Sequence, residues 1–231
     1  MGLRSMFMKR QIINTSDGST TIYIEQWDEH YHSKHGAIQE AYHVFIKSGL
    51  SAWIDQNDAK DLRILEIGFG TGLNAFITFL EHYKIGRRIT YHGVEAYPVQ
   101  KEEVALLNYV QQLDAQDYNE AFTMMHQGEW DKDLEIAPSF TLRKRKQFFD
   151  GIKDKAAFDL VYFDAFGARV QPELWDVPMF ESMYKALDKN GILVTYAAKG
   201  SVRRAMQEVG FLVEKLPGPP GKREMLRAVK K

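Results

Sequence analysis

The chain has 231 residues, of which 45% are hydrophobic and 26% are charged. This length and balance are typical of one globular domain with a substantial core, and they exclude a disordered or fibrous protein. The lack of cysteine excludes a disulfide framework, a thiolate zinc site and a cysteine nucleophile. Thirty basic residues against 31 acidic ones leave no overall charge to attract a nucleic acid, so any such site must be a local patch.

No stretch of the sequence is apolar for long enough to be a signal peptide or a membrane span. We therefore expect a soluble, cytoplasmic protein with no membrane partner. At the N-terminal end, Asp17-Gly18 followed by TTIYIEQW predicts a small hairpin, and the spacing over Ile38–Leu50 predicts a helix. We expect residues 1–60 to form a β and helical extension packed on a core of residues 61–231.

Within that core, short apolar strands alternate with helical patterns. Strands are predicted over 62–67, 89–95, 158–163 and 191–197, and helices over 73–84, 99–113 and 201–210. The stretch 139–149 also favours a strand, and 211–216 can pair antiparallel with 224–229 across a Pro- and Gly-rich loop. The predicted fold is α/β and Rossmann-like: a doubly wound, mostly parallel sheet with an antiparallel C-terminal strand, as in class I methyltransferases.

The strongest local signal is EIGFGTGLN, Glu66 to Asn74, where three closely spaced glycines join the first strand to its helix. Glycine permits positive φ and close approach of the backbone to a ligand, at the sheet edge where nucleotides bind. The pattern lacks the Gly-Lys-Ser/Thr of a phosphate-binding loop and has Leu73 where a dinucleotide fingerprint needs glycine. The actual spacing, E-x-G-x-G-x-G, resembles the first motif of class I methyltransferases, so Gly68, Gly70 and Gly72 are expected at S-adenosyl-L-methionine.

Two acids stand at the ends of predicted strands. Glu95 follows the glycines by about 25 residues, where a carboxylate can accept hydrogen bonds from the ribose hydroxyls of a nucleoside cofactor. Asp164 ends the strand FDLVYF beside the expected cofactor. Because an alkylamine must lose a proton before it attacks a methyl group, Asp164 is the expected catalytic group, which orients the amine and takes its proton. No metal is needed for this chemistry.

Several basic and aromatic residues are weaker candidates for binding RNA. Phe166 and Trp175 could stack on a displaced base, and the run Arg143 to Lys146 is more typical of a solvated face. The cluster of His30, His32 and His35 lacks a matching set of metal ligands, and it indicates a mobile segment that covers the cofactor, or a surface, in preference to a metal site. The remaining basic candidates for phosphate contacts are Lys199, Arg203, Arg204, Lys222 and Arg223.

In this order the chain carries E-x-G-F-G-T-G-L-N, V-E-x-x-P, F-D-A-F, P-E-L-W, V-R-R, G-F and K-R-E-M-L. This series, which spans most of the chain, resembles the methyltransferase family that acts on 5-aminomethyl-2-thiouridine in tRNA. The resemblance implies methylation of the amine at the wobble position, with tRNA as partner and S-adenosyl-L-methionine as cofactor. It implies Asp164 as the catalytic group and Glu66, Gly68, Gly70, Gly72, Asn74 and Glu95 around the cofactor.

Some members of that family carry a fused FAD-dependent oxidase, and this chain resembles the stand-alone methyltransferase form. It departs from the family in having Ala165-Phe166-Gly167-Ala168 after Asp164, and basic residues near Lys144 where an acid is expected. Three other functions stay open: a methyltransferase for a small amine or a protein, an NAD-dependent oxidoreductase, and a binding module without activity. Tests for a tRNA product and for turnover would separate them, and the sequence does not indicate the oligomeric state.

Overall fold

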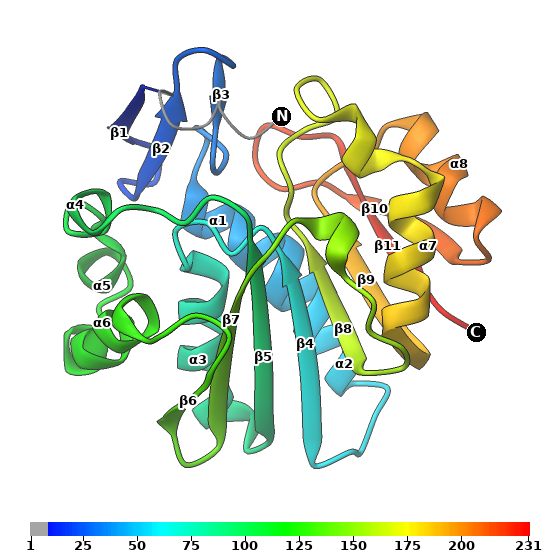
Figure 1. The fold of residues 1–231 in the computed structure, drawn as a ribbon, viewed down its shortest axis with the longest axis horizontal. Coiled ribbons are helices and arrows are strands. Elements are labelled where there is room, and N and C mark those ends of the chain that lie inside the picture. The colour runs from blue at the N-terminus through cyan, green and yellow to red at the C-terminus, as the bar shows by residue number, and fades with distance from the viewer. Residues whose placement is uncertain (1–8) are drawn as a thin grey trace.

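The computed structural model describes residues 9–231, which form two sheets (Figure 1). The smaller sheet contains β1 (Arg10–Asn14), β2 (Thr20–Ile24) and β3 (Glu29–His30), and its first two strands are the predicted hairpin. The larger sheet has eight strands, in the order β10 (Leu212–Pro217), β11 (Glu224–Val229), β9 (Leu187–Thr195), β8 (Phe158–Phe163), β4 (Asp61–Ile67), β5 (Arg88–Glu95), β7 (Phe140–Lys146) and β6 (Asp133–Ala137).

The centre of the larger sheet is parallel. Strand β4 pairs in parallel with both β5 and β8, and the parallel pairing continues to β7 on one side and to β9 on the other. The chain therefore changes direction across the sheet between β4 and β8, and ligands of doubly wound folds bind at such a point, beyond the carboxyl ends of the strands. The prediction of a doubly wound sheet is confirmed, and the loops after β4 and β8 lie together at this point.

Helices cover both faces of the larger sheet, because residues alternate between the faces along each strand. Ile64 and Tyr162 join the core that contains α3 (Leu73–Ile85), whereas Leu65 and Val161 join the core that contains α7 (Val177–Ala186) and α8 (Gly200–Glu208). Figure 1 shows α7 and α8 together on one side of the molecule. Helix α7 contributes Met179, Phe180, Met183 and Ala186 to the core on this face, and its position was not predicted from the sequence.

A continuous helical segment precedes the larger sheet, as the spacing over Ile38–Leu50 predicts. It consists of α1 (Ala37–Ala41), the π-helical stretch η2 (Tyr42–Ser51) and α2 (Ala52–Ile54). Gly49 allows this segment to lie close to β9, since a Cβ atom there would come within 2.9 Å of Val194 Cγ2. The segment thereby packs on the sheet through its buried face.

The helix predicted over 99–113 is interrupted, and this prediction is wrong in its middle. The stretch contains α4 (Lys101–Val104) and α5 (Tyr109–Gln112), and the side chain of Asn108 between them accepts a 2.8 Å hydrogen bond from the Thr20 backbone. A tertiary contact with the small sheet thus replaces a continuous helix. The remaining short elements are η3 (Gln116–Tyr118), α6 (Asn119–Gln127), η4 (Phe149–Gly151) and η5 (Pro172–Trp175).

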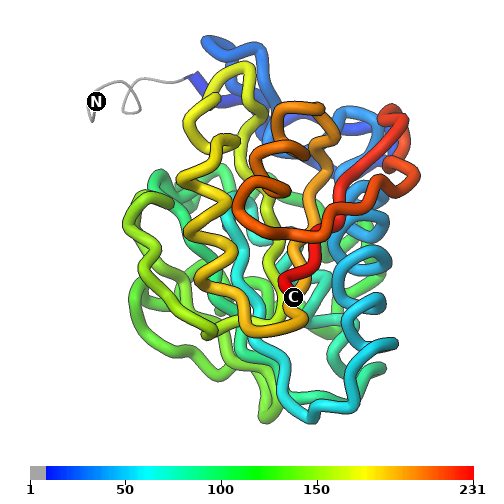
Figure 2. The backbone as a smooth tube through the Cα atoms, turned by 90° about the vertical axis from the view of Figure 1, so that its right-hand side faces the viewer, coloured from blue at the N-terminus to red at the C-terminus, as the bar shows by residue number. Residues whose placement is uncertain are grey.

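The C-terminal strands form the predicted antiparallel hairpin, with β11 pairing antiparallel to both β10 and β9. Figure 2 shows the loop of this hairpin beside the N-terminal part of the chain, drawn in blue. The contact is close, because a Cβ atom at Gly221 would collide with the His35 ring. Over residues 9–231 no helix has the length and apolar character needed to cross a membrane.

Candidate active site

The three glycines of the EIGFGTGLN motif turn the chain from β4 into α3. Gly68, Gly70 and Gly72 have φ angles of 90°, 49° and 72°, which favour glycine over residues that carry a Cβ atom. A Cβ atom at Gly68 would lie 2.7 Å from the carbonyl oxygen of Asp164, so this turn touches the loop after β8. The glycines are needed both for backbone conformation and for close approach.

Asn74 joins two carboxylates at the start of α3. Its Nδ2 atom donates hydrogen bonds of 2.9 Å to Glu66 Oε1 and 2.8 Å to Asp164 Oδ2. Asn74 and Glu66 are buried, and Asn74 Oδ1 has no hydrogen-bond partner within the described part of the chain, whereas the Tyr91 hydroxyl faces the Glu66 carboxylate. Buried polar atoms normally have partners, so Asn74 Oδ1 fits a site that receives a ligand with an N–H or O–H donor.

The two carboxylates differ from ordinary acids in their ionisation. Burial raises the pKa of Glu66 well above its usual range, and it raises the pKa of Asp164 to about 7. The nearby Glu40 carboxylate also raises the pKa of Asp164, whereas the hydrogen bond from Asn74 lowers it. Asp164 therefore exchanges its proton near neutral pH, where a general base is most effective.

Glu95 lies on the opposite side of the glycine turn from Asp164. Its carboxylate accepts hydrogen bonds from the backbone N–H groups of Gly70, at 3.1 Å, and of Tyr97, at 2.8 Å. Burial raises its pKa, and these hydrogen bonds partly counter that effect. The structure thus brings all seven sequence-predicted residues of the cofactor and catalytic set to one edge of the sheet: Glu66, Gly68, Gly70, Gly72, Asn74, Glu95 and Asp164.

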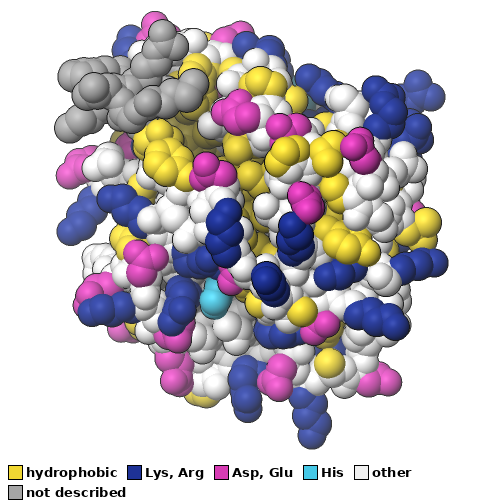
Figure 3. Space-filling model, turned by 45° about the vertical axis from the view of Figure 1, so that its right-hand side comes forward, with side chains coloured by type: hydrophobic (Ala, Val, Ile, Leu, Met, Phe, Trp, Pro, Cys, Tyr) yellow, Lys and Arg dark blue, Asp and Glu magenta, His cyan; other side chains and the backbone are white. Residues whose placement is uncertain are grey.

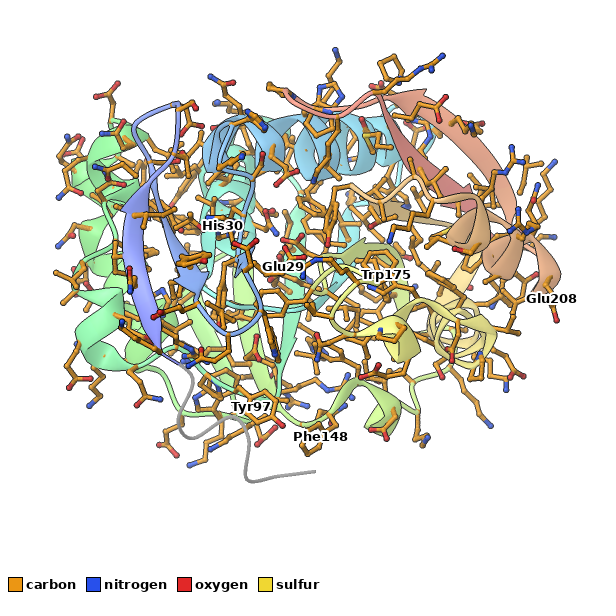
Figure 4. The ribbon with its side chains drawn as sticks, turned by 90° about the horizontal axis from the view of Figure 1, so that it is seen from above. Glu29, His30, Tyr97, Phe148, Trp175 and Glu208 are labelled. Atoms are coloured by element: carbon orange, nitrogen blue, oxygen red, sulfur yellow. The ribbon has the colours of Figure 1, made fainter. Side chains whose placement is uncertain are left out.

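The small N-terminal sheet covers this edge. Tyr31 lies against the glycine turn, since a Cβ atom at Gly70 would be 3.1 Å from its ring, and its ring meets Phe166 edge to face at 5.0 Å. Viewed from above, Glu29 of β3 lies near the middle of the edge (Figure 4). Glu29 also forms a 3.0 Å ion pair with Arg169 in the loop after Asp164. Tyr31 and Arg169 had no signal in the sequence that marked them as parts of the site.

The histidines of this covering segment interact with the protein itself. The ring of His32 lies between Thr21 Oγ1, at 3.2 Å, and Thr71 Oγ1 in the glycine turn, at 3.4 Å. Burial lowers the pKa of His32 to about 4, so the ring is neutral. Within residues 9–231 no cluster of three or more His, Cys, Asp or Glu side chains could hold a metal ion. His32 therefore links the covering segment to the glycine turn.

The weaker aromatic and basic candidates are dispersed. Trp175 is buried, and its Nε1 atom donates a 2.7 Å hydrogen bond to Phe166 O, so the suggestion that its ring stacks on a base is wrong for this structure. Lys144, in the run expected to be solvated, is 2% exposed, and burial lowers its pKa to about 8. Tyr97 and Phe148 instead form an aromatic pair at the rim of the edge, with centroids 5.8 Å apart (Figure 4).

The five basic residues expected to meet phosphate lie on α8 and the C-terminal hairpin. Arg203 is half-buried, and the Lys222 ammonium forms an ion pair of 2.5 Å with Glu40. Figure 3 shows Lys and Arg side chains along the side of the molecule where α8 and this hairpin lie. Lys222 is therefore not a free phosphate ligand in this structure, and the exposed members of the set are Lys199, Arg204 and Arg223.

Comparisons with known proteins agree with this geometry. Residues 139–231 match a family described as S-adenosyl-L-methionine-dependent methyltransferase. The chain is 30% identical over 213 residues to the tRNA 5-methylaminomethyl-2-thiouridine biosynthesis bifunctional protein MnmC of Leptospira interrogans, and 28% identical over 223 residues to that of Idiomarina loihiensis. Each match covers 87% of this chain but only 32% and 35% of those proteins, so the chain spans about a third of their length.

Solved structures show the same fold. The crystal structure of MNMC2 from Aquifex aeolicus matches 96% of this chain and 70% of that one, with a TM-score of 0.74 and 22% identity. Spermidine synthase from Thermotoga maritima matches 97% and 70%, with a TM-score of 0.58 and 12% identity. The chain belongs to the S-adenosyl-L-methionine-dependent methyltransferases, in the family that contains the matching part of the tRNA 5-methylaminomethyl-2-thiouridine biosynthesis proteins.

Proposed function

We propose that this protein transfers a methyl group from S-adenosyl-L-methionine to the amine of 5-aminomethyl-2-thiouridine at the tRNA wobble position. The observation that carries the proposal is Asp164, a carboxylate with a pKa near 7 that is hydrogen-bonded to Asn74 beside the glycine turn. Membership of the family identifies S-adenosyl-L-methionine as the methyl donor, and the names of the relatives suggest the acceptor. We propose the cytoplasm as the location, because the relatives are named for tRNA 5-methylaminomethyl-2-thiouridine biosynthesis.

The residues at the turn fit the cofactor. The turn has no room for side chains, because a Cβ atom at Gly68 or Gly70 would meet Asp164 or Tyr31, and the unpartnered acceptor Asn74 Oδ1 would suit the ammonium group of a methionine portion. Glu95 would accept hydrogen bonds from the ribose hydroxyls. We propose that Glu66, Asn74, Glu95 and the glycine backbone hold the cofactor in this manner.

When bound, S-adenosyl-L-methionine supplies an electrophilic methyl group on a positively charged sulfur. The task left to the protein is to orient the acceptor amine and to remove its proton. Asp164 would accept a hydrogen bond from the amine and take one proton as the nitrogen–carbon bond forms and the methyl carbon–sulfur bond breaks, which would leave S-adenosylhomocysteine as the by-product. The hydrogen bond from Asn74 keeps one Asp164 oxygen occupied and thereby directs the other toward the acceptor.

We further propose a division of labour along the chain. Residues 61–231 would provide the cofactor site and the base, while the described part of the N-terminal extension, residues 9–60, would cover the cofactor from the side of Tyr31. The exposed residues Lys199, Arg204 and Arg223 would contact tRNA phosphates, with the half-buried Arg203 as a lesser candidate. Incubation of the protein with methyl-labelled S-adenosyl-L-methionine and tRNA that lacks the modification, followed by nucleoside analysis, tests the function. A labelled 5-methylaminomethyl-2-thiouridine is the expected product, and a labelled small amine or protein instead would overturn the proposal.

A further inference from the structure

A lysine from the C-terminal hairpin is held on the acceptor side of the site. The Lys222 ammonium lies 3.8 Å from the centroid of the Tyr196 ring and 2.5 Å from Glu40 Oε1. The side chain of Glu40 is only 8% exposed and that of Lys222 is 31% exposed. A buried carboxylate needs a partner, so this ion pair is built into the structure and is not a chance surface contact.

Both members of the pair are fixed by neighbours close to Asp164. The Ser33 backbone donates a 2.9 Å hydrogen bond to the second oxygen of Glu40. The hydroxyl of Tyr196 donates a 2.7 Å hydrogen bond to the carbonyl of Ala165, the residue that follows Asp164. The ring under the ammonium is therefore attached to the loop that carries the proposed base.

The charges around Asp164 explain why such a pair is needed. The Glu40 carboxylate of α1 raises the pKa of Asp164, and Asp164 in turn raises the pKa of Glu66 on β4. The Lys222 ammonium has the opposite effect and lowers the pKa of Asp164. The phenol groups of Tyr91 on β5 and Tyr196 after β9 also face these acids. A second uncompensated carboxylate in a buried site would keep Asp164 protonated and unable to accept a proton.

We propose that the Glu40–Lys222 ion pair is a positioning device for methyl transfer, in which Lys222 neutralises Glu40 so that Asp164 is the carboxylate free to accept the proton of the amine. This inference rests on the proposed function, because it names residues that act through its base. The sequence favoured a phosphate contact for Lys222, and the ion pair gives it a different task. Glu40 had no assigned role.

The two single substitutions should have opposite effects on Asp164. Lys222→Met leaves Glu40 unpaired and should raise the midpoint of Asp164 ionisation by about one pH unit. Glu40→Gln removes the like charge and should lower it by a similar amount, whereas Lys222→Arg and the double variant Glu40→Gln/Lys222→Met should stay near the wild type. The midpoint is measured by carbon-13 NMR of the aspartate carboxyl groups, with Asp164→Asn to identify the resonance.

This titration needs no tRNA, so it separates the two ideas. Opposite shifts in the single variants, with restoration in the double variant, support the positioning device even if no tRNA is methylated. Unchanged midpoints in both single variants overturn it even if the wild type methylates tRNA. Should Lys222→Met fail to fold, as judged by circular dichroism, Glu40→Gln and the double variant still decide, since a lowered midpoint is expected in the first and not in the second.

Discussion

Asn74 Nδ2 lies 2.8 Å from Asp164 Oδ2. Helix α3 therefore holds the acid that follows strand β8, although Asp164 lies 90 residues after Asn74 in the sequence. The same amide nitrogen also reaches Glu66. One side chain thus connects the cofactor motif with the proposed base.

Replacing Asn74 by alanine should weaken both stability and catalysis. The change removes a donor shared by the buried Glu66 and the partly buried Asp164, which should cost about 1–3 kcal/mol of the free energy of unfolding. Because the Asn74 hydrogen bond lowers the pKa of Asp164, the rise of kcat with pH should also move to higher pH. Urea denaturation and a pH–rate profile measure the two effects. Asn119→Ala, at an exposed asparagine, serves as control, and equal behaviour of the two variants contradicts the bridging role.

Gly68→Ala should abolish binding of the cofactor, whereas Gly86→Ala should not. Both glycines have positive φ, at 90° and 61°, so both variants carry backbone strain of about 1 kcal/mol. A Cβ atom at Gly68 would meet Asp164 O at 2.7 Å, while one at Gly86 meets nothing within 4 Å. Calorimetric titration with S-adenosylhomocysteine compares them. Equal loss of affinity in both variants would mean that strain, and not the shape of the turn, determines binding.

Glu95→Gln should raise the Kd for S-adenosylhomocysteine about tenfold, which corresponds to about 1.4 kcal/mol. The carboxylate accepts from the Gly70 and Tyr97 backbones and would accept from the ribose, and glutamine offers one acceptor oxygen in place of two. Glu102→Gln, at an exposed position in α4, is the matched control. An unchanged Kd for the Glu95 variant would remove this residue from the cofactor site.

Asp164→Asn should make the protein more stable at alkaline pH. Burial raises the pKa of Asp164 to about 7, above its ordinary value of 3.8, so the native state binds this proton more tightly than the unfolded state does. Stability is then lost as pH rises from about 4 to 7, and asparagine avoids that loss. We expect a gain of about 1–3 kcal/mol at pH 8 and almost none below pH 4, measured by thermal unfolding. A variant that is less stable at pH 8 would contradict the proposed environment of this acid.

Arg204→Ala combined with Arg223→Ala should weaken tRNA binding without changing affinity for the cofactor. Loss of two phosphate contacts should raise the Kd for tRNA about tenfold and reduce the dependence of binding on salt by about two ions. Lys60→Ala, which removes an exposed charge just before β4, is the control. Filter binding at several salt concentrations measures both quantities. An identical salt dependence in the double variant and the wild type would place the RNA elsewhere.

The central sheet and its glycine turn were predictable because their signals are local. The apolar runs around Ile64 and Val161 mark buried parallel strands, and the spacing from Glu66 to Asn74 defines the turn between a strand and a helix. The position of Asp164 follows from the same logic, since parallel strands bring their carboxyl ends to one edge. These parts of the site depend on sequence order alone.

The parts that could not be predicted depend on contacts between distant segments. Tyr31 reaches the glycine turn only because the small sheet folds over the edge, and Lys222 meets Glu40 across 182 residues of sequence. The helix around Asn108 is broken by its hydrogen bond to Thr20, which outweighs a helical pattern. The basic spacing from Arg143 to Lys146 gave no sign that Lys144 is buried against Trp130.

Transfer of radiolabelled methyl from S-adenosyl-L-methionine to tRNA that lacks the modification, with wild type and Asp164→Asn compared, tests the central claim most directly. We predict that the label appears in 5-methylaminomethyl-2-thiouridine with the wild type. In the variant it should fall by at least about a hundredfold, the usual contribution of a general base. No label in tRNA from a wild type that binds S-adenosylhomocysteine, or full activity in the variant, would contradict the account.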